Sequence, residues 1–205
     1  LYMRVLKFGG TSVGSVENIE KTIAIVANQA AQSPVAVVVS ALGGVTDLLL
    51  KAGALAAKKE ESYKDILKEI SQKHISFTDT LTGGDQKVLN EISLQMSHLE
   101  DLLKGIYLIN ELSPKTLDKL ATYGELTSSY IIAAAFKHKS IDASLKDSRE
   151  LIITHKLSGK NVVNFAKTNV NCIDYFTTSH KKVTVCPGFI ATSEEGISTT
   201  LGRGG

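Results

Sequence analysis

The sequence predicts an α/β fold with a largely parallel sheet, and three observations point to it. Short runs of β-branched and apolar residues alternate with longer stretches of helical periodicity, in the order strand, helix, strand, helix. The run 35–39 consists of valines and one alanine, which is typical of a strand covered on both faces. Glycine-rich loops follow the first two predicted strands, where the ligands of open α/β sheets gather.

The first part of the chain is expected to contain two strand–helix pairs. After the first glycine pair, apolar residues recur at helical spacing, at Val16, Ile19, Ile23, Val26, Ala27 and Ala30. The predicted elements are a strand over 4–8, a helix over 16–32, a strand over 35–39, and a helix that Thr46 or Asp47 opens and that runs to about Lys59. The loop Ser40-Ala41-Leu42-Gly43-Gly44 joins the second pair.

Residues from about 60 to 113 are predicted to form a helical excursion on the surface, outside the sheet. Two charged amphipathic helices fill this segment up to about Tyr107, and Thr82-Gly83-Gly84 separates them. A further helix begins at Ser113-Pro114, because serine is a favoured cap and proline suits the first helical turn. The most apolar helix covers 122–137.

The last third of the chain is expected to return to strands around one helix. The predicted elements are strands over 141–145, 151–154 and 162–165, a helix over 167–176, a strand over 182–190 that Pro187-Gly188 interrupts late, a turn at Glu194-Glu195-Gly196, and a returning strand over 197–201. We expect residues 1–205 to form part of one domain, since this length suffices for one sizeable core.

The composition excludes several classes of partner. The 23 Lys and Arg residues nearly balance the 21 Asp and Glu residues without blocks of one sign, so neither nucleic acid nor a charged membrane surface is expected. Apolar runs such as 130–136 are too short to span a bilayer. The five histidines are scattered, so we expect no metal cluster built from protein ligands. Cys172 and Cys186 lack Cys-x-x-Cys spacing, which favours buried free thiols over a disulfide.

The two ends of the chain carry expectations of their own. Met3 is the expected natural start, with Leu1 and Tyr2 as a remnant before it, and no secretion signal precedes the first strand. We therefore expect a cytoplasmic protein. The chain stops in Leu201-Gly202-Arg203-Gly204-Gly205, a glycine-rich loop that makes a poor natural terminus because its N–H groups have nothing to hold. The sequence thus predicts a fragment cut inside a functional loop.

A phosphate site is the first functional candidate. Gly9 and Gly10 permit a sharp turn between strand and helix and leave their N–H groups open to an anion. Lys7 adds a positive charge beside that turn. The alternative is an ordinary glycine turn with a strand-end lysine that faces solvent, and the residues alone leave both interpretations open.

Further candidates lie after the second predicted strand, at the start of the apolar helix and after the last strand. Glu125 opens the apolar helix, so its carboxylate is expected to be partly buried and to need a partner. The alternative is a glutamate favoured at a helix start by the helix dipole. Ser40 and Thr46 offer hydroxyl groups, although both residue types are common caps. Arg203 stands between glycines and is either a ligand-binding group or a surface charge.

Five motifs taken together resemble one family. Lys-Phe-Gly-Gly-Thr-Ser-Val at 7–13 resembles the opening of aspartate kinases in the amino-acid-kinase family, and Val-Val-Ser-Ala with Val-Thr-Asp at 38–47 is similar to their second loop. Tyr-Gly-Glu-Leu at 123–126, Pro-Gly-Phe-Ile at 187–190 and Thr-Thr-Leu-Gly-Arg-Gly-Gly at 199–205 complete the set in family order. The first motif and the helical excursion most resemble the kinase half of bifunctional aspartate kinase–homoserine dehydrogenases. The resemblance implies a three-layer αβα sandwich with a mainly parallel sheet, incomplete in this chain.

The same resemblance implies roles for individual residues. Lys7 would be the catalytic residue and would hold the phosphates of ATP together with Gly9 and Gly10, and Ser12 would lie close to them. The residues implied for L-aspartate are Ser40, Thr46, Glu125, Phe189 and Arg203. Glu125 would face the ammonium group and Arg203 a carboxylate, since both charges of a free amino acid need partners once they leave water.

The implied reaction is phosphorylation of the side-chain carboxylate of L-aspartate by ATP to 4-phospho-L-aspartate, the first step of lysine, threonine and methionine biosynthesis. A carboxylate with a pKa of about 3.9 is already an ionised nucleophile at neutral pH, so no general base is required. Repulsion between this anion and the triphosphate opposes the reaction. Catalysis is then positioning and charge neutralisation by Lys7, the glycine N–H groups and Mg²⁺, which phosphates and water are expected to hold.

The family motif continues beyond Gly205 with Ser-Asp and a helix, so the resemblance implies that the adenine half of the kinase domain and the regulatory ACT-type domains are absent. We therefore expect this fragment to be inactive alone and to bind ATP weakly, and the full-length protein to be a homo-oligomer. Two alternatives stay open: an acyl-phosphate-forming kinase that acts on glutamate or acetylglutamate, and a non-catalytic ligand-binding module of the same fold. Glu125 argues against acetylglutamate, because an acetylated amino group offers no ammonium to pair.

Overall fold

A computed structural model describes residues 3–202, which form helices around two four-stranded sheets. In sheet A the strand order is β1-β2-β6-β3 and every pairing is parallel. In sheet B the order is β5-β4-β7-β8, with β4 parallel to β7 and antiparallel pairs at both sides. The strands are β1 (Arg4–Phe8), β2 (Val35–Val39), β3 (Ala143–Leu145), β4 (Ile153–Leu157), β5 (Lys160–Val163), β6 (Val183–Pro187), β7 (Ile190–Ser193) and β8 (Ser198–Thr200).

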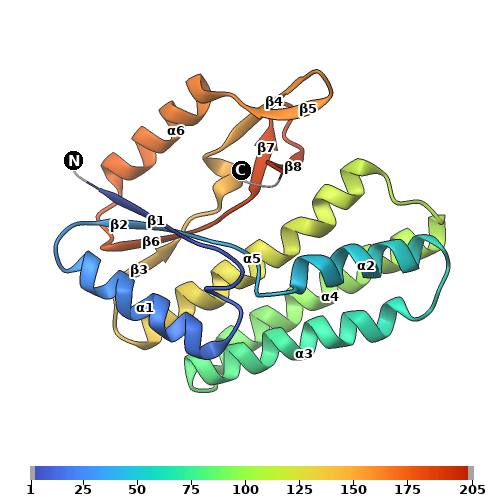
Figure 1. The fold of residues 1–205 in the computed structure, drawn as a ribbon, viewed down its shortest axis with the longest axis horizontal. Coiled ribbons are helices and arrows are strands. Elements are labelled where there is room, and N and C mark those ends of the chain that lie inside the picture. Colours follow the sequence, from blue (N-terminus) through green and yellow to red (C-terminus); the bar gives the residue numbers. More distant parts are fainter. Residues whose placement is uncertain (1–2, 203–205) are drawn as a thin grey trace.

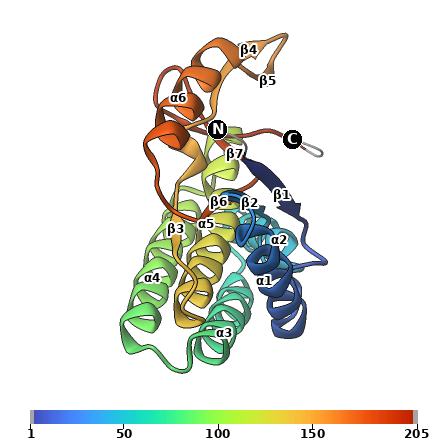
Figure 2. The same ribbon diagram turned by 90° about the vertical axis from the view of Figure 1, so that its left-hand side faces the viewer.

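The first five helices in chain order lie on one side of sheet A, where the first and the fifth contact its strands, and the sixth helix lies with sheet B on the other side (Figures 1 and 2). The helices are α1 (Val16–Ala30), α2 (Val45–Ala57), α3 (Tyr63–Thr82), α4 (Gln86–Ile109), α5 (Pro114–His138) and α6 (Phe165–Thr178); a short 3₁₀ helix, η1 (Ser148–Glu150), follows β3. Right-handed crossovers between parallel strands explain this arrangement. The chain moves across sheet A in one direction, from β1 through β2 to β3, and then in the reverse direction to β6. The helices before β3 and the helix after it therefore lie on opposite faces. The expected αβα arrangement is confirmed. The sequence predicts strands in the regions of all four strands of sheet B and the turn between β7 and β8, but not their separation into a second sheet.

The main hydrophobic core lies between sheet A and the helices α1–α5. On β1, Leu6 and Phe8 pack against this core, whereas Val5 and Lys7 are exposed on the opposite face. Strands β2 and β6 are buried along almost their whole length, as the valine run predicts. Within residues 3–202 no helix combines the length and the apolar character that a bilayer crossing needs.

The helical segment is part of the core, which differs from the expected surface excursion. As expected, α3 and α4 lie outside the sheet and separate at the glycine pair: Gly83 ends α3 with a φ of 62°, and the Asp85 side chain caps α4. Their apolar sides pack with α2 and α5, however, and the buried residues include Tyr63, Leu67, Ile70, Ile92, Met96, Leu99, Leu103 and Ile106. Charged outer faces hide this packing in the sequence.

Other boundaries differ in ways that affect the site. Residues 114–138 form one helix, so Glu125 lies in the interior of α5 instead of at a helix start. Helix α2 begins at Val45, with Gly44 as its N-cap, instead of at Thr46 or Asp47. The predicted strand over 182–190 is two strands, because the chain leaves sheet A after β6 and enters sheet B with β7. The β4–β5 hairpin is not predicted from the sequence.

Both cysteines are free, as the sequence predicts. Cys186 is buried on β6, and burial raises the pKa of its thiol to about 12. Cys172 on α6 is only half-buried.

Candidate functional site

Three loops meet at the edge of sheet A where its strands end. The register aligns Phe8 with Val39 and Val39 with Pro187, so β1, β2 and β6 end level with one another. The Ser40 N–H donates to the Phe8 carbonyl over 3.1 Å, and the Gly188 N–H donates to the Val39 carbonyl over 2.8 Å. Parallel pairing thus brings together the loops 9–15, 40–44 and 188–189, which carry most of the expected site residues.

The first loop exposes backbone donors at its glycine pair. Within residues 3–202 the N–H groups of Gly10 and Thr11 have no hydrogen-bond partner. A Cβ atom added at Gly9 or Gly10 would meet no atom within 4 Å. Unpaired amide donors beside open space suit an anion. Ser12 closes the turn, with its N–H donating to the Gly9 carbonyl over 2.9 Å.

Lys7 lies at the carboxyl end of β1, one residue before that strand ends. Its side chain is exposed, and it forms no ion pair with any residue in 3–202. It shares its face of the strand with Val5, away from the main core. Within the described residues the lysine is therefore an unpaired, exposed cation on the edge strand of sheet A, on the face opposite the main core.

The second loop packs against the first without any side chain between them. A Cβ atom on Gly43 would lie 3.0 Å from the Gly14 Cα atom and 3.3 Å from the Gly10 carbonyl oxygen, so a side chain there would force the loops apart by a few tenths of an ångström. The Ser40 carbonyl accepts a hydrogen bond of 2.8 Å from the Ser128 hydroxyl of α5. Gly44 has a φ of 81° and no capping side chain. Within the described part of the chain, the Thr46 N–H at the start of α2 therefore has no partner.

Glu125 is the buried charge of the site. Its side chain is 3% exposed, and its Oε2 atom has no hydrogen-bond partner among residues 3–202. Burial raises the pKa of Glu125 to about 7, although the backbone amides of Glu125 itself and of Ala41 act in the opposite direction. Its place in the middle of α5 excludes the helix-dipole explanation. The carboxyl group therefore lies beside the second loop, and no residue in 3–202 forms an ion pair with it.

Phe189 lies where the chain crosses from sheet A to sheet B, and its backbone is strained. Its φ is 65°, and the Ile190 N–H donates to the Gly188 carbonyl over 2.7 Å, which closes a three-residue turn around it. Such a turn is rare for a residue with a side chain, and backbone strain of this kind clusters at functional sites. The Leu201 N–H donates to the Phe189 carbonyl over 2.8 Å, so the start of the last loop reaches the same edge. Arg203 lies outside the described residues.

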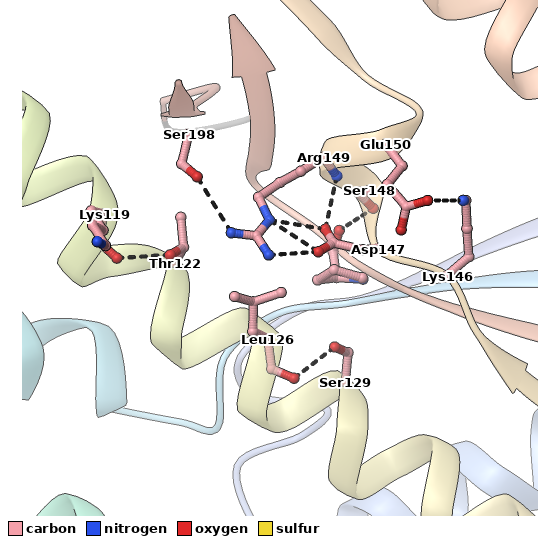
Figure 3. Close-up of polar contacts among 11 residues, drawn as sticks. Lys119, Thr122, Leu126, Ser129, Lys146, Asp147, Ser148, Arg149, Glu150 and Ser198 are labelled. Carbon is pink, nitrogen blue, oxygen red and sulfur yellow. Dashed lines mark hydrogen bonds and ion pairs between the residues drawn. The ribbon is translucent and has the colours of Figure 1, made fainter. Parts of the chain in front are cut away.

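Three residues of the segment after β3 hold this crossing in place (Figure 3). The Ser148 hydroxyl donates to the Pro187 carbonyl over 2.5 Å. The Arg149 guanidinium forms a fork with the Asp147 carboxylate, with contacts of 3.0 and 2.6 Å, and donates to the Ser198 hydroxyl of β8 over 3.3 Å. This η1 brace (Asp147, Ser148, Arg149) is not among the expected site residues. Its only sequence signal is a pair of opposite charges directly after the predicted strand 141–145.

A cavity of about 390 Å³ lies elsewhere, between the start of α5 and sheet B. Its lining includes Ser113, His155 and Thr199, and none of the expected site residues. The candidate site lies at the carboxyl edge of sheet A, outside this cavity. Within residues 3–202 no group of three or more His, Cys, Asp or Glu side chains is placed to hold a metal ion.

At its carboxyl edge the parallel sheet carries glycine loops and a buried carboxylate, which is the arrangement of an α/β protein that binds ligands at the ends of its strands. The model of the amino acid kinase family matches residues 3–205, and the chain belongs to this family. Among its relatives, the bifunctional aspartokinase/homoserine dehydrogenase 1, chloroplastic, of Arabidopsis thaliana is 29% identical over 204 residues, covering 98% of this chain and 22% of that protein. Aspartokinase 1, chloroplastic, of Arabidopsis thaliana is 32% identical over 208 residues, covering 98% of this chain and 36% of that protein.

A solved structure gives the same result. E. coli aspartokinase III, crystallised in complex with aspartate and ADP, matches with a TM-score of 0.86 at 25% identity, over 100% of this chain and 44% of that chain. The chain therefore spans less than half the length of each of these relatives. The resemblance to aspartate kinases that the five motifs carry is confirmed.

Proposed function

We propose that this chain carries the phosphate- and aspartate-binding part of an ATP-dependent kinase that phosphorylates the side-chain carboxylate of L-aspartate. The observation that carries the proposal is the buried Glu125 carboxylate, whose Oε2 atom lacks a partner within residues 3–202. An α-ammonium group is the compact cation that would pair it. The names of the relatives, which are aspartokinases, support the same substrate.

The loops at the edge of sheet A supply the remaining roles in the proposal. Ser40 and Phe189 lie in the loops at this edge and Thr46 at the start of α2, and all three are proposed to surround the amino acid together with Glu125. The unpaired N–H groups of Gly10 and Thr11, with the open space at Gly9, fit a terminal phosphate of ATP. Ser12 would lie beside that phosphate. Arg203 is proposed for a substrate carboxylate.

Mg²⁺ fits this site only as a companion of the nucleotide, because the described residues offer no cluster of metal ligands. When bound, it would neutralise phosphate charge. Lys7 is proposed to add a fixed positive charge, and the glycine loop to orient the phosphate. An oxygen of the aspartate side chain would then attack the γ-phosphorus, and ADP would leave. No residue has to remove a proton, since the attacking carboxylate is already ionised.

One experiment on the full-length protein distinguishes the proposed aspartate kinase from the glutamate or acetylglutamate kinase and from the non-catalytic module. ADP release is measured with L-aspartate, L-glutamate and N-acetyl-L-glutamate as acceptors, and L-aspartate is expected to give the highest kcat/KM. A preference for N-acetyl-L-glutamate would overturn the assignment. No turnover with any of the three, combined with retained binding of L-aspartate, would indicate a non-catalytic module.

Lys7→Ala tests the proposed phosphate site. Turnover is expected to fall by at least about 100-fold while L-aspartate still binds, because charge neutralisation acts mainly in the transition state. Lys104→Ala on α4, an exposed lysine without an ion pair in the described residues, is the matched control. Unchanged turnover in Lys7→Ala would leave this residue as an ordinary strand-end lysine.

Two further expectations belong to the whole protein. We propose a homo-oligomer, which sedimentation of the full-length protein tests. The proposed product, 4-phospho-L-aspartate, would serve lysine, threonine and methionine synthesis, and loss of the gene should then cause a requirement for these amino acids. The cytoplasmic location stays a prediction.

A further inference from the structure

Lys73 is a residue of the helical segment that reaches the candidate site. It lies in the middle of α3, and its Nζ atom donates to the Gly43 carbonyl over 2.5 Å, across 30 positions of the chain. The side chain is half-buried, and its Nζ atom lies 5.7 Å from the centre of the Phe77 ring. No ion pair joins Lys73 to a carboxylate within residues 3–202.

The carbonyl that Lys73 holds belongs to the residue where the two glycine loops touch. A Cβ atom added to Gly43 would point at the Gly14 Cα atom and the Gly10 carbonyl oxygen, which are backbone atoms of the first loop. Gly44, the next residue, is the N-cap of α2 and precedes Thr46. A shift of Gly43 would therefore move the first loop and the start of α2 together.

Glycine loops need an external constraint to keep one shape. Gly43 and Gly44 have no side chains that could pack or cap, and glycine has the largest backbone freedom of any residue. A hydrogen bond from a charged donor is roughly twice as strong as one between neutral groups. The ammonium group of Lys73 thus adds a constraint to the turn that the Val45 N–H closes on the Leu42 carbonyl over 2.9 Å.

We propose that Lys73 is a positioning residue for ligand binding at this edge. Its hydrogen bond to the Gly43 carbonyl keeps the loops 9–15 and 40–44 in a fixed position relative to one another. Its ammonium group is engaged by a backbone carbonyl, so its effect passes through the backbone. The kinetic part of this inference rests on the proposed function. The effect on the loops stands independently of it.

The test compares Lys73→Met with Lys73→Arg and with Lys68→Met in the full-length protein. Methionine keeps the length and apolar stem of the side chain and removes only the charged donor, whereas arginine retains a donor. Lys68 lies on the same helix, is exposed and makes no hydrogen bond or ion pair in the described residues, so its variant is the matched control. Amide hydrogen exchange over segments 9–15 and 41–47 reports on the loops, and KM and kcat report on the reaction.

In Lys73→Met, the amide hydrogens of both segments should exchange about tenfold faster than in the unmodified protein. The KM for L-aspartate and for ATP should rise about tenfold with a smaller change in kcat. Both effects correspond to the loss of one charged hydrogen bond. Lys73→Arg should stay within about threefold of the unmodified protein, and Lys68→Met should not differ from it.

Two results would overturn the inference. One is loop exchange in Lys73→Met equal to that in Lys68→Met. The other is a lower melting temperature with unchanged KM values, which would make Lys73 a purely structural contact between α3 and the second loop. An unmodified protein that fails to phosphorylate L-aspartate would instead contradict the proposed function. Hydrogen exchange and calorimetric binding of ADP to the variants would then decide the inference without any turnover.

Discussion

A buried carboxylate that is only partly hydrogen-bonded is unfavourable in a protein interior, and Glu125 is in this situation. It has lost nearly all contact with water, and one of its oxygens finds no donor within residues 3–202. With a pKa of about 7, its carboxyl group is neutral in roughly half of the molecules at pH 7. Any cation that enters the site will favour the ionised form, so ligand binding and protonation at Glu125 are coupled.

Glu125→Gln should change how stability depends on pH. The folded-state pKa lies above the ordinary value of 4.5, so between these values the folded state holds a proton that the unfolded state has released. The stabilising contribution is complete below about pH 4.5 and is lost as pH rises through 7. Relative to Glu125→Gln, the unmodified chain should lose up to about 3 kcal/mol between pH 5 and pH 8. Urea unfolding at both values measures this, and the exposed Glu111→Gln is the control. Equal pH dependence in all three proteins would contradict it.

Binding of L-aspartate should show the opposite dependence on pH. The proposed ionic contact needs an ionised Glu125, whose fraction rises from about one tenth at pH 6 to about nine tenths at pH 8 for a pKa of about 7. We expect affinity in the full-length protein to increase several-fold over this range, measured by isothermal titration calorimetry. Glu125→Gln should bind weakly at both pH values. A flat profile in the unmodified protein would show that Glu125 does not face the ammonium group.

At the scale of elements, the close approach of α5 to the second loop depends on Gly124. A Cβ atom there would lie 2.9 Å from the Ala41 Cβ atom and 3.3 Å from Leu49 Cδ1, so the helix or the loop would have to move. This contact determines how far Glu125 stands from the loop.

Gly124→Ala should therefore destabilise the chain by about 1–3 kcal/mol, as overpacked cores do. The matched control is Gly105→Ala on α4, where a Cβ atom would meet nothing within 4 Å. That variant should instead stabilise by up to about 1 kcal/mol, because alanine is the better helix former. Denaturant midpoints measure both changes, and changes of the same sign would contradict the packing argument.

The η1 brace makes a second prediction at this scale. Ser148→Ala removes the donor that holds the buried end of β6 at Pro187, and the loss should be about 1–2 kcal/mol. Because the brace also supports the crossing at Phe189, the KM for L-aspartate should rise in the full-length protein. Ser97→Ala on the exposed face of α4 is the control. Thermal melts and steady-state kinetics check the two effects, and a stable variant with normal KM would remove the brace from the site.

At the scale of the whole molecule, local sequence patterns predict some features of the structure and fail to predict others. The order of strands and helices places residues 9–12, 40–46 and 188–189 at one edge, because parallel strands end at the same side. The interior position of Glu125 was not predictable, because charged residues such as Lys115 and Asp118 interrupt the apolar pattern at the start of α5. Sheet B depends on pairing between β4 and β7, which are distant in sequence, and nothing local to Ile190 indicates which sheet it joins.

Exposed apolar side chains on α6 should affect the chain in solution. Phe165, Val170 and Ile173 are 69%, 66% and 64% exposed. Burying such a surface is favourable, so the isolated 205-residue chain should associate as its concentration rises. Replacing all three by serine should reduce association in sedimentation velocity, whereas Leu94→Ser, at an isolated exposed position on α4, should not. Identical behaviour of the two variants would exclude α6 as the contact.

Strand β1 is the last strand of sheet A on its side, so within the described residues only β2 pairs with it. The outer row of its backbone donors and acceptors is thus a template on which a further strand can be laid. Arg4 and Lys7 carry charges on this short edge strand, and such charges disfavour non-specific strand pairing without preventing it. A further strand, from another part of the same protein or from a second molecule, can therefore pair with β1 without displacing any strand of sheet A.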